Sequence, residues 1–148
     1  MRYWLHRISY MWNISKPLFD RNYLTVGWGY MLASNKVVSS VTSNADRNTV
    51  REAMNAYRRE NGWDEISGYK TRSLEIFAQF RPDDIVVVPL YGGLFNVVRI
   101  KSNPKPVTEL PESLIEELSV EVNDEGLYRS DSGDDALGFY VEVEKNQA

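Results

Sequence analysis

The chain has 148 residues, of which 43% are hydrophobic and 12% aromatic, enough for one globular domain with a buried core. It contains no cysteine, which excludes disulfides and thiolate chemistry and favours a cytoplasmic protein. No stretch approaches the roughly 18 apolar residues of a membrane span. We expect a single domain over residues 1–148. The last strand-like segment is followed directly by EKNQA, which fits either a natural end or a domain cut from a longer protein.

The net charge of −4 is distributed unevenly along the chain. Residues 1–81 carry 12 Lys and Arg against 7 Asp and Glu, whereas residues 82–148 carry 5 against 14. Such asymmetry is typical of a protein with a polyanion-binding face opposite an acidic one. It is equally typical of a solvated helix followed by an acidic tail, so both interpretations stay open.

The first 42 residues predict short strands separated by irregular segments. Residues 3–8 and 23–28 are rich in aromatic and branched side chains, which favour strands. Residues 11–22 lack a clear period and contain Pro17, so they predict a loop or a short helix. Residues 37–41 predict a third short strand or an extended connection.

Residues 43–62 give the clearest helical pattern. Apolar side chains recur there at the i, i+3, i+4, i+7 spacing of one buried face: Val50, Ala53, Met54 and Tyr57. Thr49 and Glu52 have the spacing of a capping box, and Gly62 is placed to end the helix. A second helix is predicted over residues 70–80, ended by Pro82 because the residue before a proline avoids the helical region.

Residues 84–90 and 94–101 are two apolar runs on either side of Tyr91-Gly92-Gly93, and this pattern predicts an antiparallel hairpin. A short helix from Pro111, short strands at 120–122 and 127–128, and a final strand at 138–144 complete the chain. The predicted fold class is therefore α+β, with a curved, mostly antiparallel β-barrel and two packed helices.

Few residues of the chain are suited to catalysis. His6 is the only histidine, and a strand histidine with a structural role accounts for it better than a general base. The acidic turn at 131–135 (DSGDD) lacks the ligand spacing of an EF-hand loop and predicts a solvated turn. We therefore predict no enzyme activity, no cofactor and no metal. A small metal-dependent nuclease using Glu75, Asp83 and Asp84 stays open as an alternative.

The tryptophans and arginines of the first half point to a binding function instead. Exposed aromatic rings beside basic residues can stack a flipped or single-stranded base. Trp28 stands between two glycines, which would allow a ligand to approach the backbone closely. The candidate nucleic-acid-binding residues are Ser9, Trp12, Trp28, Arg58, Trp63 and Arg72. Ser9 is included because of a family resemblance.

Three segments resemble the PUA-like superfamily, and most closely its EVE-type domains and the N-terminal recognition domains of modification-dependent restriction systems. The segments are MRYWLHRIS at the start, YLTVGWG at 23–29, and residues 70–101 with Arg72 and FRPDDIVVVP…LFNVVRI. The usual Gly-Asp of the family is Asp83-Asp84 here, and the Ser-Glu-Pro that follows the first strand of EVE domains is absent. Ser9, Trp28 and Arg72 match the pocket-lining segments.

The resemblance implies a mixed α/β barrel whose aromatic pocket reads a modified base in DNA or RNA. The expected function is non-catalytic sensing in a restriction or defence system, coupled to an effector domain or subunit and without membrane contact. A protein-interaction domain that uses the acidic C-terminal half is the other alternative.

Overall fold

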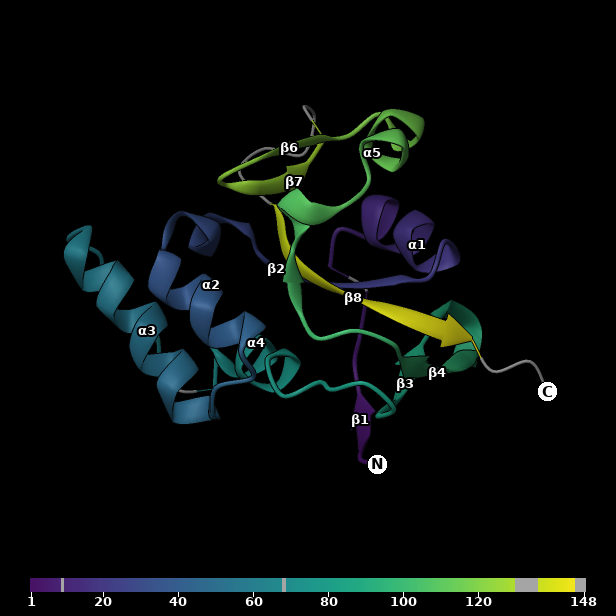
Figure 1. Ribbon diagram of the computed structural model, residues 1–148, viewed down its shortest axis with the longest axis horizontal. Coiled ribbons are helices and arrows are strands. Elements are labelled where there is room, and N and C mark those ends of the chain that lie inside the picture. The colour runs from purple at the N-terminus through teal and green to yellow at the C-terminus, as the bar shows by residue number, and fades with distance from the viewer. Residues whose placement is uncertain (9, 68, 130–135, 146–148) are drawn as a thin grey trace.

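The computed structural model (Figure 1) describes residues 1–8, 10–67, 69–129 and 136–145. These residues form a mixed α+β structure in which eight strands and five α-helices are connected by short 3₁₀ turns. The elements in chain order are β1 (Tyr3–Leu5), α1 (Trp12–Asp20), β2 (Tyr23–Trp28), η1 (Gly29–Ala33), α2 (Asn35–Thr42), α3 (Arg47–Glu60), α4 (Arg72–Phe77), β3 (Ile85–Pro89), η2 (Tyr91–Gly93), β4 (Phe95–Ile100), β5 (Lys105–Pro106), η3 (Val107–Glu109), α5 (Glu112–Leu118), β6 (Glu121–Asn123), β7 (Gly126–Tyr128) and β8 (Leu137–Lys145).

The long strand β8 holds the sheet together. Its first part pairs antiparallel with β2, β5 and β7, and its last three residues pair antiparallel with β4. Beyond β4 the sheet continues through β3 to β1, which pairs with β3 in parallel. The prediction of a mostly antiparallel sheet is therefore confirmed. Among the described strands no pairing joins β1 to β6 at the two ends of the path, so the sheet is open and the predicted barrel is not confirmed.

The predicted hairpin at residues 84–101 is confirmed. β3 and β4 pair in register from Ile85 with Arg99 to Pro89 with Phe95. The turn between them contains Gly92 and Gly93, both with φ near +75°, a conformation that glycine adopts without steric cost. The final predicted strand is likewise present as β8.

The prediction of a strand or extended connection at residues 37–41 is wrong, because these residues lie in the helix α2. The side-chain oxygen of Ser34 accepts a hydrogen bond from the Val37 amide and caps the helix. Val37 and Val41 are both fully buried, one helical turn apart. Branched side chains favour strands intrinsically, and here helical burial overrides that preference.

Residues 11–22 contain a true helix, α1, although Pro17 lies inside it. The proline removes the hydrogen bond to the Asn13 carbonyl, and the helix tolerates this because Asn13 is exposed to water. The predicted capping box of α3 is wrong. The helix begins after Asp46, whose side chain accepts a hydrogen bond from the Thr49 amide at 2.8 Å.

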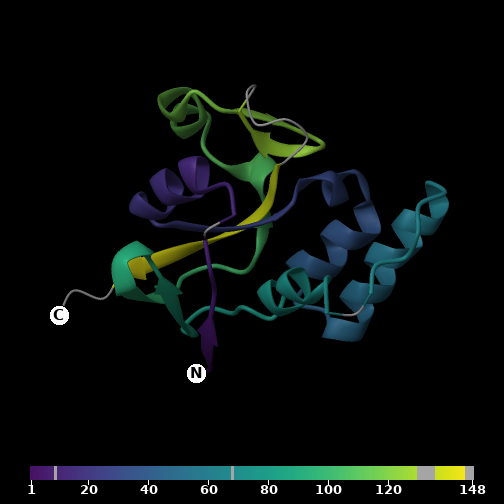
Figure 2. The same cartoon turned by 180° about the vertical axis from the view of Figure 1, so that it is seen from behind.

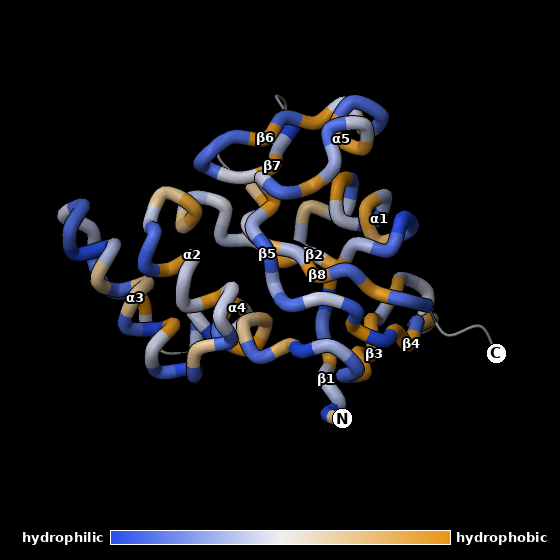
Figure 3. The backbone as a smooth tube through the Cα atoms, in the orientation of Figure 1, coloured by the Kyte–Doolittle hydropathy of each residue, from blue (hydrophilic) through white to orange (hydrophobic). Residues whose placement is uncertain are grey.

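The predicted number of packed helices is too small. Figures 1 and 2 show α2, α3 and α4 gathered at one end of the molecule, with α5 and the β6–β7 hairpin in another corner. Figure 3 shows hydrophilic residues along much of α3 and around α5. None of the helices in the described part of the chain is long and apolar enough to cross a membrane.

Candidate functional site

A cavity of about 780 Å³ opens between the end of β2, the first turn of α4 and the segment that connects β1 to α1. This volume lies within the range of roughly 300–1,000 Å³ that is typical of sites for small molecules. Four aromatic rings make up much of its wall, and they come from three separate places in the chain: Tyr10, the pair Trp28 and Tyr30, and Tyr69. Tertiary structure alone brings these rings together.

Trp28 is the most unusual residue of this wall. Its backbone is in the left-handed helical region, with φ 67° and ψ 34°. For a bulky side chain this conformation costs roughly 1–2 kcal/mol, and residues held in this way cluster at functional sites. The half-buried indole donates a hydrogen bond from Nε1 to Ser73 Oγ at 2.9 Å. Trp28 therefore bridges β2 and α4 across the cavity.

The glycines on either side of Trp28 make room for protein rather than only for a ligand. A Cβ atom at Gly27 would lie 2.9 Å from the ring of Tyr10, so glycine lets that ring lie against β2. A Cβ atom at Gly29 would lie 2.5 Å from the carbonyl oxygen of Glu125. Both glycines also line the cavity, and their small size fixes the positions of its neighbouring walls.

Helix α4 carries Arg72 and Ser73 on the cavity wall, and a fully buried carboxylate holds it against α3. Glu75 accepts hydrogen bonds from Arg51 at 2.7 and 3.0 Å and from Arg47 at 3.3 Å. Burial would raise the pKa of Glu75. The hydrogen bonds from Arg51 and Thr71, with the charges of both arginines, outweigh burial and lower this pKa below its usual range. Glu75 is therefore ionised and structural.

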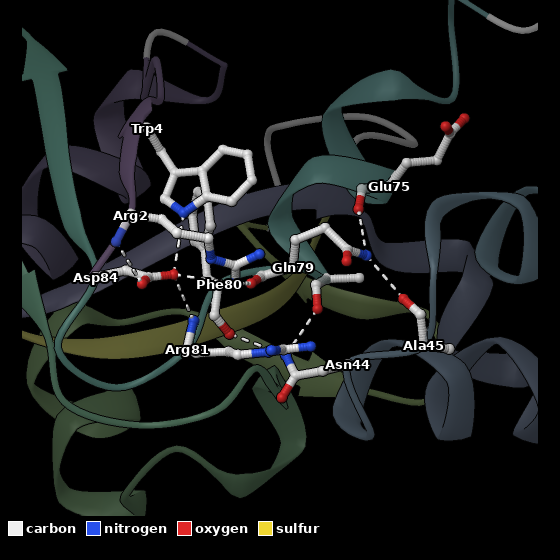
Figure 4. A network of polar contacts seen from close by, with 10 residues as sticks. Arg2, Trp4, Asn44, Ala45, Glu75, Gln79, Phe80, Arg81 and Asp84 are labelled. Carbon is white, nitrogen blue, oxygen red and sulfur yellow. Dashed lines mark hydrogen bonds and ion pairs between the residues drawn. The ribbon is translucent and has the colours of Figure 1, made fainter.

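A second polar network fixes the far end of α4 (Figure 4). The buried Asp84 accepts hydrogen bonds from the Arg2 amide and from Trp4 Nε1, each at 3.1 Å. The side-chain amide of Asn44 donates to the Ala78 carbonyl at 2.7 Å, which ties the α2–α3 turn to α4. Burial would raise the pKa of Asp84, but these donors and the charge of Arg2 lower it.

The three carboxylates of the nuclease alternative do not form a site. Glu75 and Asp84 are each engaged in one of the two networks above, and Asp83 is exposed, 3.8 Å from Arg99. In the described part of the chain, no group of three or more His, Asp or Glu side chains could hold a metal ion. These carboxylates give the nuclease alternative no support.

The charged residues on the cavity wall are basic. Arg7 and Arg72 line the cavity, both are exposed, and no described carboxylate lines it with them. Neither arginine forms an ion pair with another described residue. The opening of the cavity therefore attracts anions, as a site for a nucleotide phosphate would.

Two buried polar residues, His6 and Thr25, also line the cavity. His6 lies just after β1, and its Nε2 is 2.7 Å from the backbone oxygen of Thr25. Because a carbonyl oxygen only accepts, Nε2 carries the proton. Burial lowers the pKa of His6, although the bond to Thr25 opposes this effect, so the ring is neutral near pH 7. The ring packs against Phe77 and Phe80.

The structure brings together four of the six residues that the sequence singled out. Trp28 and Arg72 line the cavity itself. Arg58 and Trp63 lie behind Tyr30: Arg58 donates to the Tyr30 hydroxyl at 2.9 Å and stacks over the Trp63 ring at 5.6 Å. The ring of Trp63 also contacts that of Tyr30, with centroids 5.9 Å apart.

The structure does not place the two remaining sequence-predicted residues, Trp12 and Ser9, at the cavity. Trp12 does not line the cavity and packs against Tyr91 of the hairpin turn, with ring centroids 4.5 Å apart. Ser9 and the acidic turn at 131–135 lie outside the described residues. Sequence reasoning missed Tyr10, Tyr30 and Ser73. The only signal was adjacency in sequence: Tyr30 follows the GWG step, Ser73 follows Arg72, and Tyr10 follows Ser9.

Comparison of the chain with family models, with curated proteins and with solved structures finds no match. The PUA-like resemblance therefore stays a prediction, and any function must be argued from the site.

Proposed function

We propose that this domain binds nucleic acid and accepts one base, in modified form, in the aromatic cavity without altering it chemically. In this role it is the sensing module of a cytoplasmic restriction or defence system, with an effector domain or subunit as its partner. The observation that carries the proposal is the strained, half-buried Trp28 in the wall of a cavity of about 780 Å³.

The aromatic wall suits a planar heterocycle. Every base has a π face, and stacking on an aromatic side chain contributes about 1–3 kcal/mol per base. Trp28 and Tyr30 lie with ring centroids 6.1 Å apart on the same side of the cavity. A base extruded from its strand exchanges the stack that it leaves for contacts with these rings.

The charge distribution suits a nucleotide rather than an uncharged ligand. Arg7 and Arg72 are exposed on the cavity wall, where they can hold the phosphates on either side of an extruded base. Exposed carboxylates gather instead on α5 and β6: Glu112, Glu116, Glu117 and Glu121. Their repulsion keeps non-specific affinity for duplex DNA modest.

The arrangement of the sheet is in keeping with a PUA-like fold. β8 pairs with strands of both parts of the sheet, and the cavity lies beside β2, its main partner. We propose that the domain has a PUA-like fold of the EVE type, in which this sheet forms an incompletely closed barrel. This assignment rests on the sequence resemblance together with the position of the cavity.

Titration of tryptophan fluorescence with plain, methylated and hydroxymethylated oligonucleotides at two salt concentrations tests the function. Trp28→Ala is expected to weaken binding roughly 5- to 150-fold, since one stacked base is lost. Trp12→Phe is the matched control, because Trp12 lies outside the cavity, and it should bind as the wild type does. Equal binding by all three proteins, or no binding of any oligonucleotide, would contradict the proposal.

A second candidate function is protein contact, favoured by apolar side chains exposed on β1 and on the β3–β4 hairpin. These are among the most exposed large hydrophobic residues of the described chain: Tyr3, Leu5, Tyr91, Leu94 and Phe95. Exposed apolar groups at neighbouring positions mark interaction surfaces. Sedimentation of wild type and Phe95→Ser at several concentrations tests whether this surface mediates self-association.

A further inference from the structure

Thr25, on the cavity wall, has a side-chain hydroxyl that no described residue satisfies. The residue is 2% exposed, and within the described chain its Oγ1 is the one fully buried side-chain oxygen or nitrogen without a hydrogen-bond partner. Buried hydroxyls are nearly always hydrogen-bonded, so an unpartnered one requires an explanation. Thr25 lines the cavity, so a bound molecule becomes the partner of this hydroxyl once rotation about χ1 turns it toward the cavity.

His6 offers a second unused group on the same wall. Its Nε2–H is engaged by the Thr25 carbonyl, which leaves Nδ1 as a pure acceptor. Among the described residues Nδ1 has no partner, and it is not among the fully buried unpartnered atoms. Nδ1 is therefore within reach of a molecule from solvent, and His6 lines the cavity.

We propose that His6 Nδ1 and Thr25 Oγ1 read the polar edge of the base that enters the cavity. This inference rests on the proposed function and adds the chemistry of the ligand to it. The base presents an N–H donor to His6 Nδ1 and a second polar atom to the Thr25 hydroxyl, which can donate or accept. The exocyclic amino groups of cytosine, adenine and their methylated forms satisfy this requirement, as does that of guanine.

The tautomer of His6 makes the reading selective. Nδ1 can accept but not donate while Nε2 is protonated, so a ligand that places only a carbonyl oxygen there leaves two acceptors facing each other. A site built to hydrogen-bond a polar group rejects analogues that lack it, since its own buried groups would stay unpaired. Arg7 and Arg72 are exposed and hold the backbone, whereas His6 and Thr25 are buried and contact the base.

The first test uses nitrogen-15 NMR of the imidazole ring. His6 is the only histidine, so its two ring nitrogens are assigned without mutagenesis. The probes are short single strands with one central 5-methylcytosine, 5-hydroxymethylcytosine or N6-methyladenine, and the control is the same strand with an abasic site. A strand that binds is expected to shift the Nδ1 signal while the Nε2 signal changes little. An unchanged Nδ1 signal at saturation would overturn the inference.

The second test compares Thr25→Val, which removes the hydroxyl, with Thr25→Ser, which keeps it. Thr25→Val should bind the best of the three modified strands roughly 2- to 13-fold more weakly, the effect of one hydrogen bond. Thr25→Ser should bind within about threefold of wild type, because its hydroxyl still reaches the base. The Tm of ligand-free Thr25→Val should be no lower than that of wild type, since no hydrogen bond within the protein is lost.

The outcomes separate this inference from the function on which it rests. If Trp28→Ala loses binding while Thr25→Val binds as wild type does, the reading by Thr25 is wrong and the base pocket stands. If ligand-free Thr25→Val unfolds several degrees below wild type, the hydroxyl has a structural partner and the inference is wrong. If none of the modified strands binds better than the abasic control, the inference and the proposed function both fall.

Discussion

The indole Nε1 of Trp28 donates a hydrogen bond to Ser73 Oγ at 2.9 Å, and this contact joins the end of β2 to the first turn of α4. Both residues line the cavity, so the bond sets the separation of two of its walls. The same indole projects from a backbone in the left-handed region. Trp28 is therefore held in a costly conformation, with one edge of its ring bonded in the wall of the cavity.

Two variants that both lack the indole test whether the backbone of Trp28 is strained. Trp28→Gly and Trp28→Ala both lose the indole, but only glycine adopts the φ of 67° without cost. We expect Trp28→Gly to be more stable than Trp28→Ala by about 1 kcal/mol, as measured by urea unfolding. Equal stability of the two variants would show that position 28 is unstrained.

A variant that keeps the indole but removes its hydrogen bond tests what the contact with Ser73 contributes. Ser73→Ala should lower the free energy of unfolding by about 0.5–1.5 kcal/mol, the net contribution of one hydrogen bond. It should also weaken binding of the probe oligonucleotides less than Trp28→Ala does, because the stacking face remains. An effect on binding as large as that of Trp28→Ala would mean that Ser73 itself contacts the ligand.

The carboxylate of Glu75 is expected to hold the cavity wall formed by α4. Glu75→Gln keeps the shape of the side chain but removes the charge that binds Arg47 and Arg51. Because both arginines reach solvent, we expect a loss of about 1.5–3 kcal/mol in urea unfolding. Glu52→Gln is the control, since Glu52 is exposed and lies 3.7 Å from Arg59, and it should change stability by less than about 1 kcal/mol.

Asp83 occupies a backbone position that favours glycine. Its φ is 76°, and its ion pair with Arg99 at 3.8 Å is exposed and contributes little. Asp83→Gly is therefore expected to raise the free energy of unfolding by about 0.5–1 kcal/mol. Asn44→Gly is the matched comparison, because Asn44 also has a positive φ but donates hydrogen bonds to the Ala78 and Phe80 carbonyls. That variant should lose stability.

Stability should fall in acid in two steps. Burial lowers the pKa of His6 from its ordinary value of 6.5, so below this pH the unfolded chain binds a proton that the folded protein does not. The pKa values of Glu75 and Asp84 are lowered from 4.5 and 3.8, so a second loss begins near those values. Urea unfolding between pH 8 and 3 measures both, and constant stability from pH 6.5 to 5 would contradict the role given to His6.

Local patterns in the sequence determined the elements whose signals lie within a few residues. The β3–β4 hairpin follows from two apolar runs around Gly92 and Gly93, because glycine meets the positive φ of the turn. The buried face of α3 follows from the spacing of Val50, Ala53 and Met54. In both cases the chemistry that selects the structure is local.

Tertiary packing decided α2 and the cavity. Val37 and Val41 have an intrinsic preference for strands. Burial of one face of α2 outweighs this preference and stabilises the helix. The two flanking glycines pointed to Trp28 in the sequence. Nothing local indicated that Tyr10, His6 and Thr25 would share its cavity. Those side chains are gathered because the segment after β1 lies against β2, where His6 bonds to the Thr25 carbonyl and the Tyr10 ring lies against Gly27. The Trp28–Ser73 bond joins α4 to the same wall. Long-range pairing and burial, unlike turn chemistry and helical period, leave no mark in any single segment of the sequence.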